Sequence, residues 1–207
     1  MCRQRERLLD PLEVRKGCDL RRPEVDFHLA CKKYQRSSAG KIFQAEEVRN
    51  PETCLETMTF LTDFVLEADI YNDIFASTPS FEEIYSYLHD RCRAVRIDLH
   101  LQQPWSSRTQ EFVTCHEYCL RFEILANILF REKDVNKSIY DPHLGLQAIS
   151  QTIDPLLAAY QDARERGQAF DTEAPIRRLV ILLLLATSPE LLPMHLAALD
   201  RNMLEDP

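Results

Sequence analysis

The sequence predicts an all-α fold, an array of antiparallel helical pairs joined by short polar loops. Apolar residues recur at steps of three and four over long stretches, and capping residues repeatedly stand directly before proline. No run of alternating apolar and polar residues is long enough to predict a strand. Only 4 glycines are present, which also argues against many tight β turns. Together these observations predict about seven or eight helices.

The composition is that of a folded protein, with 207 residues of which 45% are hydrophobic and 28% charged. This length permits one sizeable core, so we predict a single helical domain over 1–207 with a charged N-terminal lead segment, 1–22. The formal net charge of -8 repels polyphosphate at long range. Binding of nucleic acid would therefore need a local basic patch.

The cysteines indicate the redox compartment of the chain, and the apolar runs indicate whether it could span a membrane. Seven cysteines, an odd number, and a charged stretch after Met1 in place of an apolar signal segment predict free thiols in a reducing, intracellular compartment. The longest apolar run, 179–186, is far shorter than the roughly 20 residues that a bilayer needs. We predict that this run is a buried helix segment.

Helix starts are predicted where a capping side chain precedes proline. Such a residue can accept hydrogen bonds from the first backbone N–H groups, and proline suits the first helical turn. Ser80 and Glu83 add a capping box. The predicted starts are Asn50-Pro51, Asp141-Pro142, Asp154-Pro155 and Ser188-Pro189.

Apolar spacing predicts two long helices, from Ser80 to about Gln103 and from Thr109 to about Glu132. The stripe of the first contains Ile84, Leu88, Cys92, Val95 and Leu99. The stripe of the second contains Phe112, Cys115, Cys119, Phe122, Ala126 and Leu129.

A further apolar stripe lies at the end of the sequence. It either folds back on the preceding helix or forms the open end of a stacked helical array that a partner covers. The second alternative predicts a protein interface made of Leu192, Leu196, Leu199 and Met203.

The stretch DRCRAVRIDL, residues 90–99, concentrates charge on the first long helix. Arg91 lies at the edge of the apolar stripe, where its stem can pack and its guanidinium can meet a carboxylate of a neighbouring helix. We therefore predict a structural role for Arg91, shared with Asp98 on the packed side.

Another face of this helix is predicted to be solvated and mildly basic, and it is the candidate site for phosphate or RNA. Two arginines and two mostly neutral histidines release few counterions, so RNA contact is the less favoured alternative. The residues concerned are His89, Arg93, Arg96 and His100.

The sequence gives little support for a metal site or a catalytic site. Cys115, His116 and Cys119 would need a fourth ligand to hold zinc, and both cysteines fall on the apolar stripe, so core packing is favoured and no metal is predicted. The nucleophile elbow GxSxG and the phosphate-binding patterns GxxxxGK and GxGxxG are absent from the sequence. We predict neither an enzyme nor a cofactor.

Several segments, in order along the chain, resemble the SAC-three/GANP (germinal-centre-associated nuclear protein) family. MCRQRER resembles its opening Met-Cys-Pro followed by Glu-Arg, and LACKKYQRSSAGK its Lys-Lys-Tyr motif. DRCRAVRIDL resembles Asp-Arg-x-Arg-Ala-Ile-Arg-x-Asp-Leu, and CLRFEIL resembles Ala-Arg-Phe-His-Ile, with Glu123 in place of the histidine. The resemblance adds Tyr34 and Arg121 to Arg91 and Asp98 as structural motif positions.

The resemblance implies a right-handed stack of antiparallel helical hairpins, like PCI and TPR arrays, without the terminal winged helix of larger members. Such members pair with a PCI-domain protein and a small acidic subunit in a nuclear-pore-associated complex for transcription and mRNA export. A short, stand-alone branch linked to centrosome duplication and mitotic progression is the alternative. The implied location is the nucleus or nuclear envelope, or else the cytoplasm and centrosome. We expect weak or indirect RNA contact and no membrane binding.

Overall fold

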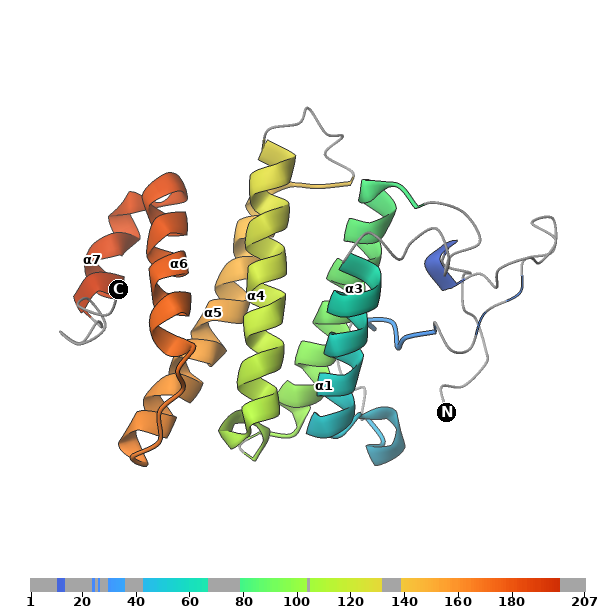
Figure 1. The fold of residues 1–207 in the computed structure, drawn as a ribbon, viewed down its shortest axis with the longest axis horizontal. Helices are drawn as coiled ribbons and strands as arrows, with labels where there is room; N and C mark the ends of the chain where they lie inside the picture. The colour runs from blue at the N-terminus through green and yellow to red at the C-terminus, as the bar shows by residue number, and fades with distance from the viewer. Residues whose placement is uncertain are drawn as a thin grey trace. The chain divides into compact units, whose positions relative to one another are not determined.

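The structure, a computed structural model, describes residues 11–13, 24, 26, 30–35, 43–66, 79–103, 105–131 and 139–197. Every regular element within these ranges is a helix (Figure 1), which confirms the all-α prediction. The chain divides into two compact units, Met1–Thr152 and Ile153–Pro207. The division falls inside one helix, and the single domain over 1–207 stays a prediction, because a compact unit does not by itself define a domain.

The first unit is built on three helices that pack against one another (Figure 1). They are α1 (Pro51–Phe60), which continues as the π-helical turn η3 (Leu61–Leu66), α3 (Phe81–Leu101) and α4 (Gln110–Arg131). The predicted stripes face the core, because the side chains fully buried between the helices include Met58, Leu88, Cys92, Val95, Leu99, Phe112, Cys115 and Cys119.

The predicted caps are present at three helix starts. Asn50 Oδ1 accepts a hydrogen bond from Thr53 N at 2.8 Å at the start of α1. Ser80 and Glu83 form the reciprocal capping box of α3. Asp141 Oδ1 accepts from His143 N at 2.8 Å at the start of α5 (Pro142–Glu165).

Asp154-Pro155 does not start a helix, so this prediction was wrong. Pro155 lies inside α5, which continues through it to Glu165. Proline in a helix interior costs about 3 kcal/mol or more, because it removes one hydrogen bond and clashes with the preceding turn. Buried residues on both sides of it, Ile153 and Leu156, indicate that packing outweighs this cost.

The second unit contains the end of α5, then α6 (Glu173–Thr187), the 3-10 turn η6 (Pro189–Leu191) and α7 (Leu192–Ala197). The described part of the last segment folds back on α6, since α6 and α7 are in contact. Pro189 begins η6 as predicted, although Ser188 makes no side-chain capping bond.

The apolar run 179–186 lies in α6 and is only partly buried, which corrects the prediction. Val180, Leu183 and Leu184 are buried, but Leu182 and Leu185 are 63% and 57% exposed. Eight consecutive apolar residues cover the whole circumference of a helix, so one face must point away from the unit's own core. Among the described residues, no helix is long and apolar enough to cross a membrane.

Candidate functional site

Arg91 of α3 forms a buried ion pair with a segment far away in the sequence. Its Nη2 donates to Glu13 Oε1 at 2.8 Å, and both side chains are 1% exposed. Its Nη1 donates to Asp90 Oδ2 at 2.6 Å, and the guanidinium lies over the Tyr87 ring. The structure thus gives Arg91 a buried carboxylate as predicted, but from the 3-10 turn η1 (Pro11–Glu13) and not from a neighbouring α-helix.

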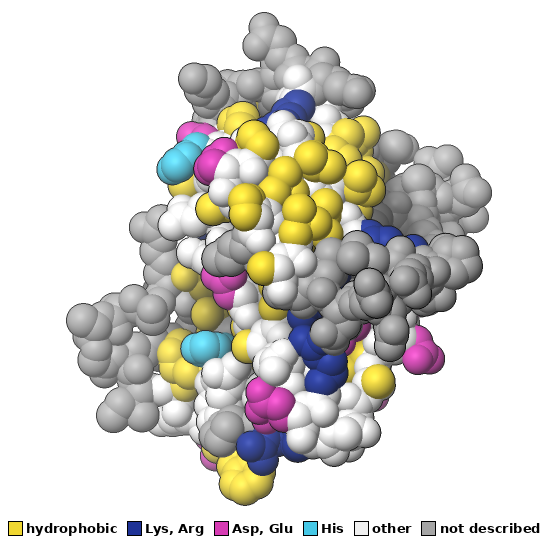
Figure 2. All heavy atoms as spheres, turned by 90° about the vertical axis from the view of Figure 1, so that its left-hand side faces the viewer, with side chains coloured by type: hydrophobic (Ala, Val, Ile, Leu, Met, Phe, Trp, Pro, Cys, Tyr) yellow, Lys and Arg dark blue, Asp and Glu magenta, His cyan; other side chains and the backbone are white. Residues whose placement is uncertain are grey.

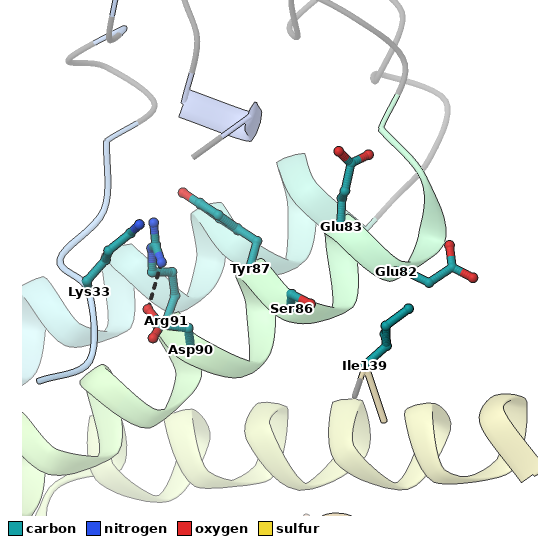
Figure 3. Close-up of a pocket in the computed structure, with 8 residues that line it drawn as sticks. All are labelled: Lys33, Glu82, Glu83, Ser86, Tyr87, Asp90, Arg91 and Ile139. Carbon is teal, nitrogen blue, oxygen red and sulfur yellow. Dashed lines mark hydrogen bonds and ion pairs between the residues drawn. The ribbon is translucent and has the colours of Figure 1, made fainter. Parts of the chain in front are cut away.

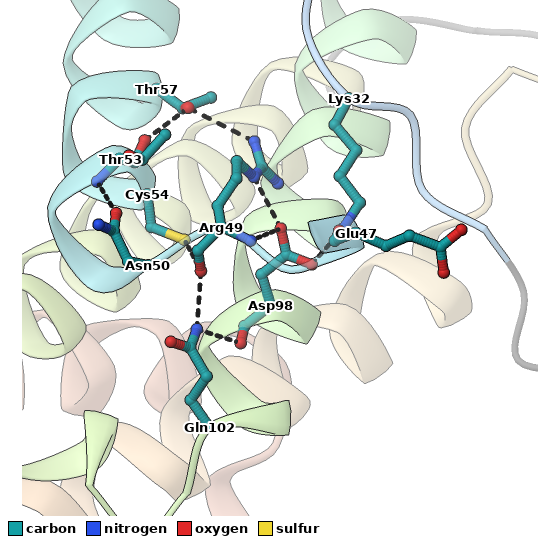
Figure 4. A network of polar contacts seen from close by, with 9 residues as sticks. All are labelled: Lys32, Glu47, Arg49, Asn50, Thr53, Cys54, Thr57, Asp98 and Gln102. Carbon is teal, nitrogen blue, oxygen red and sulfur yellow. Dashed lines mark hydrogen bonds and ion pairs between the residues drawn. The ribbon is translucent and has the colours of Figure 1, made fainter. Parts of the chain in front are cut away.

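Asp98, two turns further along α3, joins two other segments to this helix (Figure 4). Its carboxylate is buried and accepts from Arg49 Nε at 2.7 Å and from Lys32 Nζ at 2.5 Å. Lys32 also donates to the carbonyl of Glu47. Gln102 Nε2 completes the network by donating to the carbonyls of Arg49 and Asp98, each at 2.7 Å.

Tyr34 belongs to residues 30–35, the N-terminal stretch that also contains Lys32, and it attaches this stretch to α3 at a further point. Its backbone N donates to Asp90 Oδ2 at 3.1 Å, and its ring lies 4.0 Å from the guanidinium of Arg93. Residues 30–35 have no regular structure of their own. Their position therefore depends on side chains of α3. We call this set of side chains the α3 seam; it comprises Asp90, Arg91, Arg93 and Asp98.

The face that was predicted to be solvated is largely engaged within the protein, which corrects that expectation. His89 Nδ1 lies 2.8 Å from Oε1 of the buried Glu123, and Arg96 Nη1 donates to Thr152 Oγ1 at 2.7 Å. Arg93 covers Tyr34, and His100 alone of the four is exposed. The cause is that α3 packs against α4 and against residues 30–35, and Arg96 reaches Thr152 of α5. RNA contact through these residues stays a prediction.

Arg121 differs from the other motif positions. Its side chain is 46% exposed, and its Nη2 is 3.5 Å from Glu117 Oε2, one turn earlier in α4. Glu117 itself is buried, at 5% exposure, whereas the guanidinium of Arg121 keeps its contact with water. The structural role of Arg121 as a motif position stays a prediction.

The cluster Cys115, His116 and Cys119 lies in the core of the first unit. Both cysteines are fully buried, and Cys119 Sγ is 3.9 Å from Met58 Sδ. Burial raises the pKa of the Cys115 thiol well above its ordinary value, so the metal-binding thiolate form is disfavoured. His116 Nδ1 donates to the Phe112 carbonyl at 2.8 Å, and no group of three metal-ligating side chains is found among the described residues.

His116 makes stability depend on pH. Burial lowers its pKa from 6.5 to about 3 and outweighs the opposite effect of the bond to Phe112. The unfolded chain therefore binds the extra proton between pH 6.5 and about 3, and stability falls as pH decreases through this window at ~1.4 kcal/mol per pH unit. Between pH 7 and 5, wild type is expected to lose ~2 kcal/mol more than His116→Gln in urea unfolding. A matched His143→Gln variant keeps the wild-type loss, and equal losses in all three proteins would contradict the assignment.

A pocket of about 470 Å³ opens beside the α3 seam (Figure 3). Several of its charged groups already support the fold: Asp90 and Arg91 bond each other, and Glu83 Oε2 accepts from the backbone N of Ser80. These lining residues therefore stabilise α3, and we assign no catalytic role to the pocket. The lining residues are Lys33, Glu82, Glu83, Ser86, Tyr87, Asp90, Arg91 and Ile139.

The second unit exposes a set of large apolar side chains, which Figure 2 shows as a cluster on the side that faces the viewer. We call it the α6–α7 apolar face, and it comprises Leu182, Leu185, Leu191 and Leu196. Of the predicted interface residues, Leu196 belongs to it, Leu192 is half-buried, and Leu199 and Met203 lie outside the described residues. Leu182 and Leu185 were missed because the run that contains them was read as buried.

Comparison with known proteins agrees with the motifs. The sequence pattern of the SAC3/GANP family matches residues 1–207. The chain is 29% identical over 189 residues to SAC3 family protein B of Arabidopsis thaliana. This match covers 90% of the chain and 10% of the relative, so the chain spans about a tenth of the length of that curated relative.

Proposed function

Since the chain belongs to the SAC3/GANP family, we propose that it is a non-enzymatic helical scaffold that enters a protein complex through the α6–α7 apolar face. The observation that carries the proposal is the exposure of four leucines on consecutive elements, between 44% and 63%. Fully burying an exposed leucine is worth about 1.5–3 kcal/mol, and roughly half of that gain remains for each of these partly exposed side chains. A partner that covers all four would gain enough to offset a substantial part of the cost of association.

The partner that we propose for this face is a PCI-domain protein, in a nuclear-pore-associated complex for transcription and mRNA export that also contains a small acidic subunit. Family resemblance supports this choice, and so does the helical character of the face, because an apolar helix surface packs well against another helix of a stack. The proposed location is accordingly the nucleus or nuclear envelope.

Affinity purification of the tagged chain from its own cells tests the proposal. Wild type is expected to recover a PCI-domain protein in stoichiometric amount, and Leu182→Asp with Leu185→Asp is expected to reduce that recovery at least tenfold. The matched control replaces Leu101 and Leu144, which are also exposed, by aspartate and keeps the partner. Circular dichroism checks that both variants remain helical.

Two results would contradict the proposal. Recovery of centrosomal proteins in place of a PCI-domain protein would favour the stand-alone role in centrosome duplication and mitosis. Equal recovery of the PCI-domain protein by wild type and by the Leu182, Leu185 variant would show that another surface binds it.

A further inference from the structure

The outer side of α4 carries a second exposed apolar surface, bordered by positive charge. Leu125 and Ile128 are 43% and 50% exposed, and Arg121 and Arg131 are exposed at either end. The four residues follow the helical steps i, i+4, i+7 and i+10 and so share one side of the helix. We call them the α4 stripe.

The helix that presents this stripe is firmly held. Its opposite side is buried within the first unit through side chains that include Phe122, Ala126 and Phe130. Asn127 Nδ2 donates to Tyr140 Oη at 2.8 Å and fixes the same turn from the other side. A partner would therefore bind a preformed surface, and ordering this surface on binding would cost little free energy.

The charge of the stripe is opposite to that of the chain, whose formal net charge is -8. From Tyr118 to Arg131, the exposed and half-exposed positions of α4 include two arginines and no carboxylate, because Glu123 is buried. Arg121 is 3.5 Å from Glu117, which is buried, but its own side chain is 46% exposed, so the guanidinium remains accessible to a partner.

We propose that the α4 stripe docks an amphipathic helical segment of a partner protein whose apolar seam is bordered by carboxylates. Leu125 and Ile128 supply the apolar contact, and the two arginines recognise carboxylates of the partner. Arg131 follows Arg121 by ten helical steps, which places the two residues about 15 Å apart along the axis. Charges at both ends of a short apolar contact fix the register and orientation of the bound helix.

Two synthetic 15-residue helical peptides with the same leucine seam test the proposal, one flanked by glutamates and one by lysines. Fluorescence anisotropy at low salt is expected to show at least tenfold tighter binding of the glutamate peptide. Arg121→Gln with Arg131→Gln should abolish this preference, and Arg121→Glu with Arg131→Glu should reverse it. Leu125→Ser with Ile128→Ser should weaken both peptides at least tenfold.

Matched variants separate this site from general charge effects and from the α6–α7 apolar face. Arg108→Gln with Arg166→Gln removes the same charge elsewhere and should keep the preference. Leu182→Asp with Leu185→Asp should also keep it, whatever the outcome of the purification above. The proposal is overturned if neither peptide is preferred, or if Arg121→Gln with Arg131→Gln leaves the preference for the glutamate peptide intact. It is also overturned by an oligouridine that binds the protein more tightly than the glutamate peptide does and displaces this peptide only when both arginines are present.

Discussion

Replacing Arg91 by alanine is expected to lower the free energy of unfolding by about 3–5 kcal/mol. The substitution leaves the Glu13 carboxylate, which is 1% exposed, without its guanidinium partner. A buried charge that loses its partner costs far more than the intact pair contributes. Urea unfolding followed by circular dichroism measures the loss directly.

Arg121→Ala is the matched control, because Arg121 also occupies a family motif but is 46% exposed. Its expected loss is smaller, about 1 kcal/mol, because the guanidinium is largely in water and its contact with the buried Glu117 is long, at 3.5 Å. A variant with Met at position 91 and Gln at position 13 removes both charges and should be more stable than Arg91→Ala. Equal losses for Arg91→Ala and Arg121→Ala would contradict the structural role of Arg91.

Replacing Asp98 by alanine is expected to cost about 3 kcal/mol, because its buried carboxylate is shared by Arg49 and Lys32. The loss is smaller than for Arg91, since the two cations are partly exposed and can regain water. Asp98→Asn should cost less than the alanine variant, because its amide oxygen can still accept one of the two bonds.

An exposed carboxylate elsewhere in the first unit provides the comparison for Asp98. Asp63 is exposed in η3, and Asp63→Ala is expected to change stability by less than about 0.5 kcal/mol. A loss for Asp98→Ala as small as that for Asp63→Ala would show that the network in Figure 4 contributes little to the fold.

The helices were predictable because their signals are local. Capping side chains before Pro51 and Pro142, and the box at Ser80 and Glu83, mark helix starts within four residues. Pro155 misled the same reasoning, because the packing that keeps α5 continuous comes from other parts of the chain and is not visible in the local pattern.

The different burial of the two motif arginines follows from helical phase. At 100° per residue, Arg91 lies about 60° from the centre of its apolar stripe, whereas Arg121 lies about 130° from the centre of the stripe on α4. Phase could therefore have predicted that Arg121 is exposed. It could not have named Glu13 as the partner of Arg91, because their separation of 78 residues includes long stretches without periodicity.

The α6–α7 apolar face was predictable only in part for a related reason. The run 179–186 is apolar at every position, so it has no phase from which an inner and an outer side can be distinguished. Only the folded unit shows that Leu182 and Leu185 point away from Val180 and Leu184.

Hydrogen exchange of the amides in residues 30–35 tests most directly whether the α3 seam holds these residues in place against α3. The amides of Cys31 and Tyr34 donate to the carboxylates of Glu13 and Asp90, and Lys32 is bonded to Asp98. In wild type these two amides are predicted to exchange at least tenfold more slowly than in Asp98→Ala, with Asp63→Ala behaving like wild type. Exchange in wild type at the rate of an unstructured peptide would contradict the account.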